Sequence, residues 1–268
     1  MKKHILNFFI IIFAGVFIFS GSMLLKSFLE NKKNASEYNE LTELIKTKSV
    51  PVNADTDTSY APDTSTETAE EAAEVTELTA AESYEELYAK NNDFIGWIRI
   101  DGTDINYPVM QTKDRPDYYL RRNFYGNYSD FGVPYMAEHC TVGESDNLII
   151  YGHHLHIGTM FTSLMKYTSK AFFDEHRIVN FDTMQEYGTY TIIAVFKETV
   201  YESNTFQYYN FVKFGDETEF DNFVNKCQSL SLYNTGETAK FGDQLLTLST
   251  CEYSSENGRL VVIAKKIA

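Results

Sequence analysis

Cys251 lies where the sequence pattern places a thiol at the end of a β-strand. It follows the apolar run 244–250 and directly precedes a polar turn, 252–258. The next apolar run begins with Arg259, and an antiparallel hairpin would return that guanidinium toward the thiol. A cation there stabilises either a thiolate or the oxyanion that forms when a thiolate attacks a carbonyl. The local pattern alone leaves a reactive cysteine and an inert one equally open.

A second chemical candidate is the histidine cluster that follows the apolar run 147–151. It consists of His153, His154 and His156. A cysteine nucleophile requires a histidine as acid and base, and the two can be distant in sequence if they meet in the fold. His153 precedes Cys251 by 98 positions (251 − 153), and this order disfavours papain-like proteases, in which the cysteine comes first.

The competing interpretation of these histidines is a metal site. His139 and Cys140 could join His153, His154 and His156 as ligands. The spacing matches no zinc signature, however, and supporting carboxylates are not evident. The spacing therefore disfavours a metal site.

The remaining cysteines, Cys140 and Cys227, are predicted to be structural. Three cysteines without a C-x-x-C pair exclude a zinc ribbon and a disulfide-dense scaffold. Cys227 recurs at helical spacing with Phe220, Phe223 and Val224, which is typical of a buried helix face. At least one of the three thiols is free or paired with another chain.

The chain from about residue 82 onward has the pattern of a mainly β domain with peripheral helices. Helical periodicity occurs at 83–91, at 159–167 continuing toward 176, and at 217–230. Eight short strands suggest a closed barrel, which would hold residues at strand ends on its rim. The candidate strands are 97–100, 105–109, 133–136, 147–151, 178–181, 189–197, 244–250 and 259–266.

The N-terminal segment predicts a membrane anchor within residues 1–30. Residues 5–25 carry no formal charge and could cross a hydrocarbon core of about 30 Å as a helix. Small residues at 20–22 would also suit a cleaved signal peptide, but the apolar run exceeds the usual length of roughly 7–15 residues. Lysines flank the span on both sides, so we expect an inside N-terminus and an extracytoplasmic C-terminal domain from its length and position alone.

Residues 31–81 read as a solvated linker between the anchor and the domain. Positions 51–89 contain acidic residues and no Lys or Arg, and few large apolar side chains are present to drive folding. Part of 36–48 has helical spacing. Much of the net charge of −15 lies in this linker, and the absence of a basic stripe argues against nucleic acid as a partner.

Separated motifs give the chain a resemblance to the sortase family. Thr-Leu-Ser-Thr-Cys at 247–251, followed by Arg259, resembles the family's T-L-x-T-C…R signature, and the serine before Thr-Cys is similar to class B. Tyr-Gly-His at 151–153 matches the position of the family's active-site histidine. Further similarity lies in 94–98, 105–109, 158–161 and the helix near 217–230, so the resemblance covers nearly all of 82–268.

The resemblance implies an eight-stranded sortase barrel preceded by N-terminal helices, and a cysteine transpeptidase without a cofactor. Cys251 would attack the threonine carbonyl of a C-terminal sorting signal, His153 would act as acid and base, and Arg259 would bind the oxyanion. The partners implied are surface proteins that bear the signal and an amine of a cell-wall precursor. Three further residues match class B positions near the signal peptide: Ser249, Glu252 and Leu120.

Two features depart from class B patterns. The turn from Cys251 to Arg259 is short, and the loop 198–211 is rich in aromatic residues and does not align, so the signal sequence is not predicted. Two other functions stay open. A cysteine hydrolase of cell-wall peptides would use the same residues without an amine acceptor, whereas a non-enzymatic surface module would bind metal or haem through the histidines.

Overall fold

The computed structural model describes residues 2–45, 78–155, 158–202 and 204–268. The chain forms two compact units, Met1–Ile45 and Lys46–Ala268. Residues 46–77, which make up most of the predicted linker 31–81, lie outside the described residues, and so does His156 of the histidine cluster.

The first unit is the helix α1, Lys2–Glu43. It extends past the predicted anchor 1–30 and includes 36–43 of the stretch for which helical spacing was noted. Its stretch Phe13–Glu43 is long and apolar enough to span a membrane, with a mean hydropathy of 1.4 over its most apolar window. Apolar side chains such as Phe17 and Leu24 are exposed along it.

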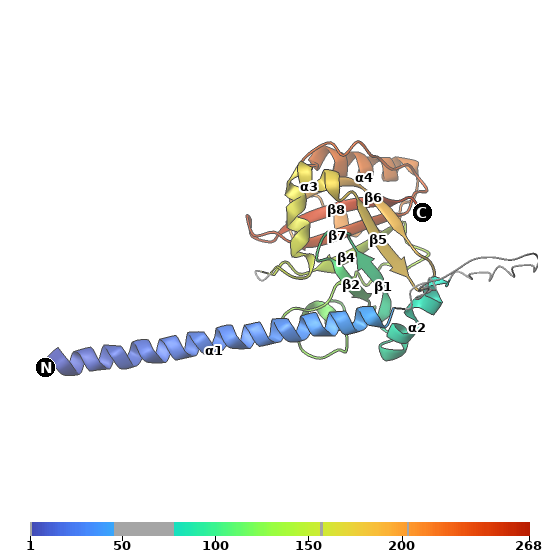
Figure 1. Cartoon of the computed structure of the whole chain (residues 1–268). Helices are drawn as coiled ribbons and strands as arrows, with labels where there is room; N and C mark the ends of the chain where they lie inside the picture. Colours follow the sequence, from blue (N-terminus) through green and yellow to red (C-terminus); the bar gives the residue numbers. More distant parts are fainter. Residues whose placement is uncertain (1, 46–77, 156–157, 203) are drawn as a thin grey trace, which may run out of the picture. The chain divides into compact units, whose positions relative to one another are not determined.

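The second unit is built on a closed barrel of eight strands, in the order β1-β2-β3-β4-β7-β8-β6-β5 (Figure 1). All eight predicted strands are confirmed. β1 begins three residues earlier than predicted, and β3 is reduced to two residues. The bounds are β1 Phe94–Arg99, β2 Asn106–Met110, β3 Tyr135–Met136, β4 Asn147–Gly152, β5 Ile178–Thr183, β6 Thr189–Thr199, β7 Leu245–Cys251 and β8 Gly258–Lys266.

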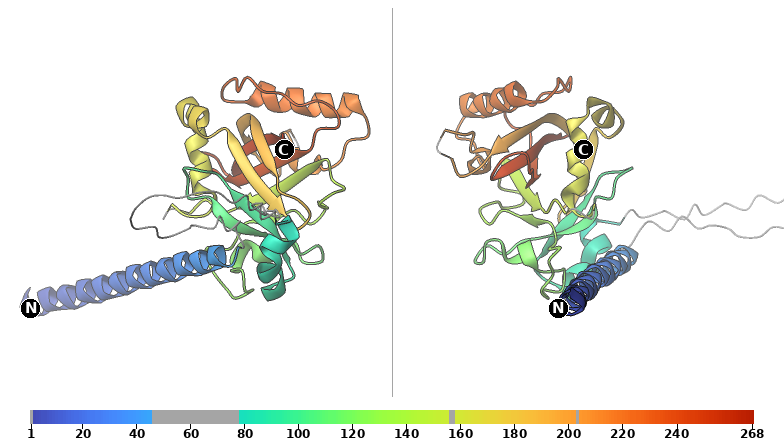
Figure 2. Two further views of the ribbon diagram at one scale, coloured as in Figure 1. Left: turned by 45° about the vertical axis from the view of Figure 1, so that its right-hand side comes forward. Right: turned by 90° about the vertical axis from the view of Figure 1, so that its left-hand side faces the viewer.

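Helices cover the barrel at two ends, with α2 (Ala80–Lys90) and α4 (Glu217–Leu230) far apart in every view (Figure 2). Thr79 and Glu82 form a capping box that fixes the start of α2. The helix predicted from 159 onward is divided into the 3-10 helix η2 (Phe161–Thr168) and α3 (Lys170–Glu175), because Ser169 is extended. Short 3-10 turns form η1 (Tyr118–Arg121) and η3 (Tyr208–Asn210).

The core beneath α4 is aromatic and buries the cysteine of that helix. Phe220, Phe223 and Cys227 pack with Phe196 of β6 and Val261 of β8, and all five are at most 2% exposed. Burial raises the pKa of Cys227 and that of Cys140, the latter to about 11. Both thiols are therefore protonated and inert at neutral pH, as the sequence predicted for structural cysteines.

Candidate active site

Two ladders of the barrel bring the chemically interesting residues to one rim. The antiparallel β7–β8 pair places Cys251 opposite Arg259 across the sheet. The parallel β4–β7 pair ends with Gly152 opposite Thr250. At this end of the pair, the Thr250 hydroxyl donates a hydrogen bond to the Gly152 carbonyl oxygen at 2.8 Å. His153 therefore leaves β4 beside Cys251, although 98 positions separate them in the sequence.

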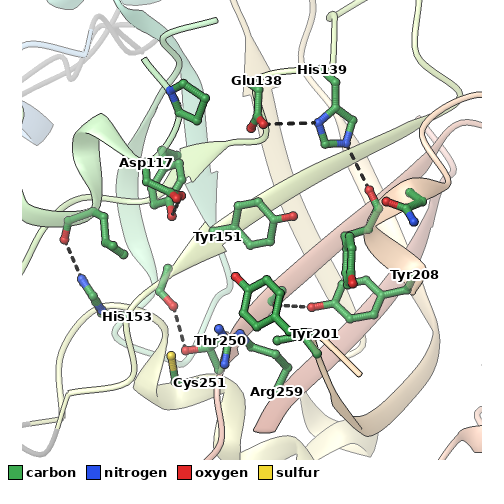
Figure 3. A pocket seen from close by; sticks show the side chains of 18 residues that line it. Asp117, Glu138, His139, Tyr151, His153, Tyr201, Tyr208, Thr250, Cys251 and Arg259 are labelled. Carbon is green, nitrogen blue, oxygen red and sulfur yellow. Dashed lines mark hydrogen bonds and ion pairs between the residues drawn. The ribbon is translucent and has the colours of Figure 1, made fainter. Parts of the chain in front are cut away.

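These residues line a cavity of about 460 Å³ at this rim. His153, Cys251 and Arg259 lie around one side of it, while Glu138 and His139 lie toward the other (Figure 3). The Cys251 side chain is half-buried, and the thiol forms no disulfide. The structure thus brings together the cysteine, the histidine and the arginine that the sequence singled out.

The His153 ring is held from the side opposite the thiol by the η1 segment. Its Nε2 lies 2.6 Å from the carbonyl oxygen of Leu120, and because a carbonyl only accepts, Nε2 carries the hydrogen. Burial lowers the pKa of His153 and the Arg121 guanidinium lowers it further, against the hydrogen bond to Leu120, which raises it. The ring is therefore mainly neutral at pH 7, and Nδ1 is the atom that gains and loses a proton.

Two of the three residues predicted near the signal peptide line the cavity. Leu120 does so with a side chain that is 37% exposed, and Ser249 does so from β7, two positions before Cys251. The Ser249 hydroxyl lies 2.7 Å from the Tyr208 hydroxyl of η3. Burial raises the pKa of Tyr208 to about 12, so this phenol stays neutral.

Glu252, the third predicted contact, is not among the residues that line the cavity. Its side chain is only 8% exposed and lies 3.0 Å from Lys197 Nζ of β6. The Ser254 hydroxyl and backbone N–H also donate to its carboxylate. Burial alone would raise the pKa of Glu252, but the hydrogen bonds from Ser254 and Lys197 outweigh it and lower the pKa. Glu252 is thus an anchor of the β7–β8 loop.

The cavity also contains residues that sequence reasoning missed. Tyr201, Tyr208 and Tyr209 belong to the aromatic loop 198–211, whose composition stood out although its role could not be read. Asp117 and Glu138 are single carboxylates in loops, and no sequence signal distinguished them. Asp117 has a left-handed backbone (φ 58°) and accepts a hydrogen bond from Tyr135 at 2.6 Å.

Three of the four histidines weighed as metal ligands, His139, His153 and His154, are directed to backbone carbonyls. His153 contacts Leu120 as above, while His154 Nδ1 lies 3.0 Å from the Cys251 carbonyl oxygen and His139 Nε2 lies 3.1 Å from that of Tyr209. Within the described part of the chain, no group of three or more His, Cys, Asp or Glu side chains could hold a metal ion.

Comparison with known proteins decides the family. Residues 98–267 match the family described as the Sortase domain. The chain belongs to the sortase family, in class B. Sortase B of Listeria monocytogenes serovar 1/2a is 30% identical over 260 residues, which cover 96% of this chain and 94% of the relative. The chain is accordingly a cysteine transpeptidase.

Solved structures of class B sortases share the fold. Sortase B from B. anthracis is 38% identical, with a TM-score of 0.61, over 69% of this chain and 84% of the other. A substrate complex of Staphylococcus aureus sortase B is 31% identical, with a TM-score of 0.63, over the same shares of the two chains. Both similarities confirm the eight-stranded sortase barrel expected from the sequence.

Proposed function

We propose that this sortase cleaves a C-terminal sorting signal after threonine, with Cys251 as nucleophile, His153 as acid and base, and Arg259 as oxyanion ligand. The observation that carries the proposal is the position of all three residues on one cavity, on two ladders that share β7. A related sortase B has been solved as a substrate complex, which supports a peptide substrate for this cavity.

In the first half-reaction, Nδ1 of His153 takes the proton of the Cys251 thiol, and the resulting thiolate attacks the threonine carbonyl carbon. A C–S bond forms while the carbonyl π electrons move to oxygen, and the Arg259 guanidinium stabilises that oxyanion. The oxyanion then collapses and the C–N bond breaks. The departing amine takes a proton from Nδ1 of His153, which leaves a thioester on Cys251.

In the second half-reaction, an amine of a cell-wall precursor attacks the thioester. His153 Nδ1 accepts the amine proton, a C–N bond forms and the C–S bond breaks, which regenerates the thiolate. His153 can serve both steps because the Leu120 carbonyl occupies only its Nε2 hydrogen. Water in place of the amine would release an acid, as in a cysteine hydrolase.

Ser249 and Leu120 are proposed to contact the signal peptide. Both line the cavity. Leu120 belongs to the η1 segment whose carbonyl holds the His153 ring, and Ser249 lies on β7, the strand of the nucleophile. Glu252 adjoins the nucleophile in sequence, but its carboxylate is engaged by Lys197 and Ser254. We therefore assign its influence on the substrate to the shape of the β7–β8 loop that it holds.

We further propose that α1 anchors the enzyme in the cell membrane, with the N-terminus inside and the catalytic domain, residues 82–268, outside. Its length and hydropathy support a membrane span. The acidic segment that follows would then act as a linker. This placement brings the cavity to the compartment in which surface proteins and cell-wall amines meet.

The test is mass spectrometry of the full chain in detergent, incubated with a library of sorting-signal peptides and an amine acceptor. A thioacyl adduct on Cys251, cleavage after threonine, and loss of both in Cys251→Ala would support the proposal. Acid as the product even at high amine concentration would favour the hydrolase instead. No adduct with any peptide, from a protein whose Cys251 a thiol reagent alkylates readily, would contradict the substrate assignment.

A further inference from the structure

His154 makes a contact with the nucleophile's backbone that the proposed chemistry does not use. Its Nδ1 lies 3.0 Å from the carbonyl oxygen of Cys251. A carbonyl only accepts, so Nδ1 of His154 donates this hydrogen bond. Two consecutive histidines therefore have different partners: the His153 ring is held by Leu120, and the His154 ring holds Cys251 itself.

The bond falls where the sheet stops supporting Cys251. On the β8 side Cys251 is paired with Arg259, but on the β4 side the ladder ends one residue earlier, at Gly152 and Thr250. A strand end that lacks a neighbour on one side is free to shift. The His154 ring supplies a connection from the β4 side at this position.

His154 is itself fixed. Its backbone forms an isolated antiparallel bridge with Met160, and the Phe161 N–H donates to the His153 carbonyl oxygen at 2.9 Å. Its ring stacks on Tyr253, with centroids 4.9 Å apart and planes at 29°. The Tyr253 hydroxyl donates in return to the His154 carbonyl oxygen at 2.7 Å.

The loop after β4 and the loop after β7 are thus joined by three reciprocal contacts, and Cys251 lies between them. The His154 ring donates a hydrogen bond to the Cys251 carbonyl oxygen and stacks on Tyr253, two residues further along. Together these contacts fix the position of the thiol along the strand. Displacement of a reacting atom by about 1 Å can cost on the order of a hundredfold in rate. The site therefore gains from a rigid backbone at Cys251.

We propose that His154 is a positioning residue, which holds the Cys251 thiol at the place where His153 and Arg259 act on it. The inference rests on the proposed function for its kinetic consequence, but not for its structural basis. His154 is not among the residues that line the cavity. It acts on catalysis only through the backbone of Cys251 and the stacked ring of Tyr253.

The experiment compares His154→Asn with His154→Leu in the full chain. The Asn amide nitrogen hangs from Cγ as Nδ1 does and can donate to the Cys251 carbonyl, whereas Leu has the same branching and no donor. We expect His154→Leu to lower kcat for peptide cleavage about tenfold or more while KM changes less than twofold. His154→Asn should retain kcat within about threefold of the wild type.

His176→Leu is the matched control. His176 Nδ1 lies 2.9 Å from the Phe172 carbonyl oxygen, and its ring stacks on Phe172, so this variant removes the same kinds of contact away from the cavity. It should lower Tm and leave kcat unchanged. Equal kcat in His154→Leu and His154→Asn, or a loss of kcat that simply follows Tm across the three variants, would overturn the proposal.

A readout without any sorting peptide separates this inference from the proposed function. The alkylation rate of Cys251 by iodoacetamide, followed by peptide mass so that the other cysteines are not counted, should fall about threefold in His154→Leu and stay near wild type in His154→Asn. If this difference holds while no peptide is cleaved, the positioning role stands and the substrate assignment fails. Identical alkylation rates in the two variants refute the positioning role.

Discussion

Gly132 lies directly against the His153 ring. Its φ is +60°, in the left-handed region, and a methyl group built on it would come within 3.1 Å of His153 Cδ2 and 2.5 Å of the Leu120 carbonyl oxygen. That carbonyl is the acceptor that holds the ring. A glycine at this position therefore makes room for both partners of the hydrogen bond that orients His153, the proposed acid and base.

Gly132→Ala should lower both stability and activity. The positive φ alone costs about 1–2 kcal/mol for a residue with a Cβ, and the contacts with His153 and Leu120 add to it because backbone must move. We expect a lower Tm, and a fall in kcat of about tenfold or more because the ring is displaced. Thermal unfolding and peptide cleavage on the same preparation measure the two effects.

Gly143→Ala is the control for backbone strain. Gly143 has a φ of +81°, but a methyl group there would meet nothing within 4 Å. Because only the backbone strain applies, it should lower Tm by less than Gly132→Ala does and leave kcat unchanged. If Gly143→Ala and Gly132→Ala had equal effects on kcat, the contact with His153 would have no part in the loss.

A second prediction concerns Arg259, which faces Cys251 across the β7–β8 ladder. Loss of an oxyanion ligand typically costs about 10²–10³ in kcat. Arg259→Met should therefore slow acylation by that order, and Arg259→Lys should recover only part because an ammonium lacks the planar fork. Single-turnover release of the leaving peptide measures this step. A higher KM with an unchanged acylation rate would instead make Arg259 a substrate ligand only.

The Cys–Arg pairing was readable from the sequence because it is local. An apolar run, a polar turn and a second apolar run predict a hairpin, and the hairpin fixes which side chains face each other. The pairing of His153 with Cys251 was different. It depends on the parallel ladder of β4 and β7, which no periodicity reveals. The chemistry of a cysteine nucleophile suggested a partner in the histidine cluster, and the resemblance to a family identified that partner as His153.

Three features of the site lay beyond the sequence for a related reason. The Lys197–Glu252 pair joins β6 to the loop after β7, the Gly132–His153 contact joins two loops, and the roles of Tyr201, Tyr208 and Tyr209 depend on the path of an irregular segment. Each is set by tertiary packing between segments distant in sequence. Local propensities carry no information about such contacts.

A third prediction follows from the lowered pKa of His153. The acid limb of kcat/KM reports the lower of the two pKa values of the Cys–His pair in the free enzyme. Because burial and Arg121 lower the His153 pKa, this limb should lie below pH 6.5, the ordinary value for histidine. Arg121→Gln removes one of the two lowering influences and should move the limb to higher pH.

Arg99→Gln serves as the comparison for that profile. Arg99 lies on β1 and pairs with Asp101 at 2.8 Å. The Arg99→Gln variant therefore removes a similar, partly exposed charge from another part of the barrel. Its acid limb should coincide with that of the wild type. An acid limb above pH 6.5, or equal shifts in the two arginine variants, would show that His153 does not set it.

The last prediction concerns the stability that Glu252 provides and its dependence on pH. The folded-state pKa of Glu252 is lowered by Ser254 and Lys197 below the ordinary value of 4.5, despite its burial. A lowered carboxyl pKa contributes stability that is present above the unfolded-state value and is lost as pH falls through the folded-state value. Glu252→Gln should therefore destabilise the protein by about 1–3 kcal/mol at pH 7, and the difference from wild type should shrink below pH 4.5.

Trp97 provides the measurement, because it is the single tryptophan of the chain and is 3% exposed in the barrel. Its fluorescence during thermal unfolding in detergent gives Tm for both proteins across the pH range. Asp101→Asn breaks an exposed ion pair with Arg99 and should change Tm little at any pH, since such pairs contribute about 0–1 kcal/mol. A difference in Tm between wild type and Glu252→Gln that stayed constant from pH 7 to pH 3 would mean that packing, rather than the charge on Glu252, holds the loop after Cys251.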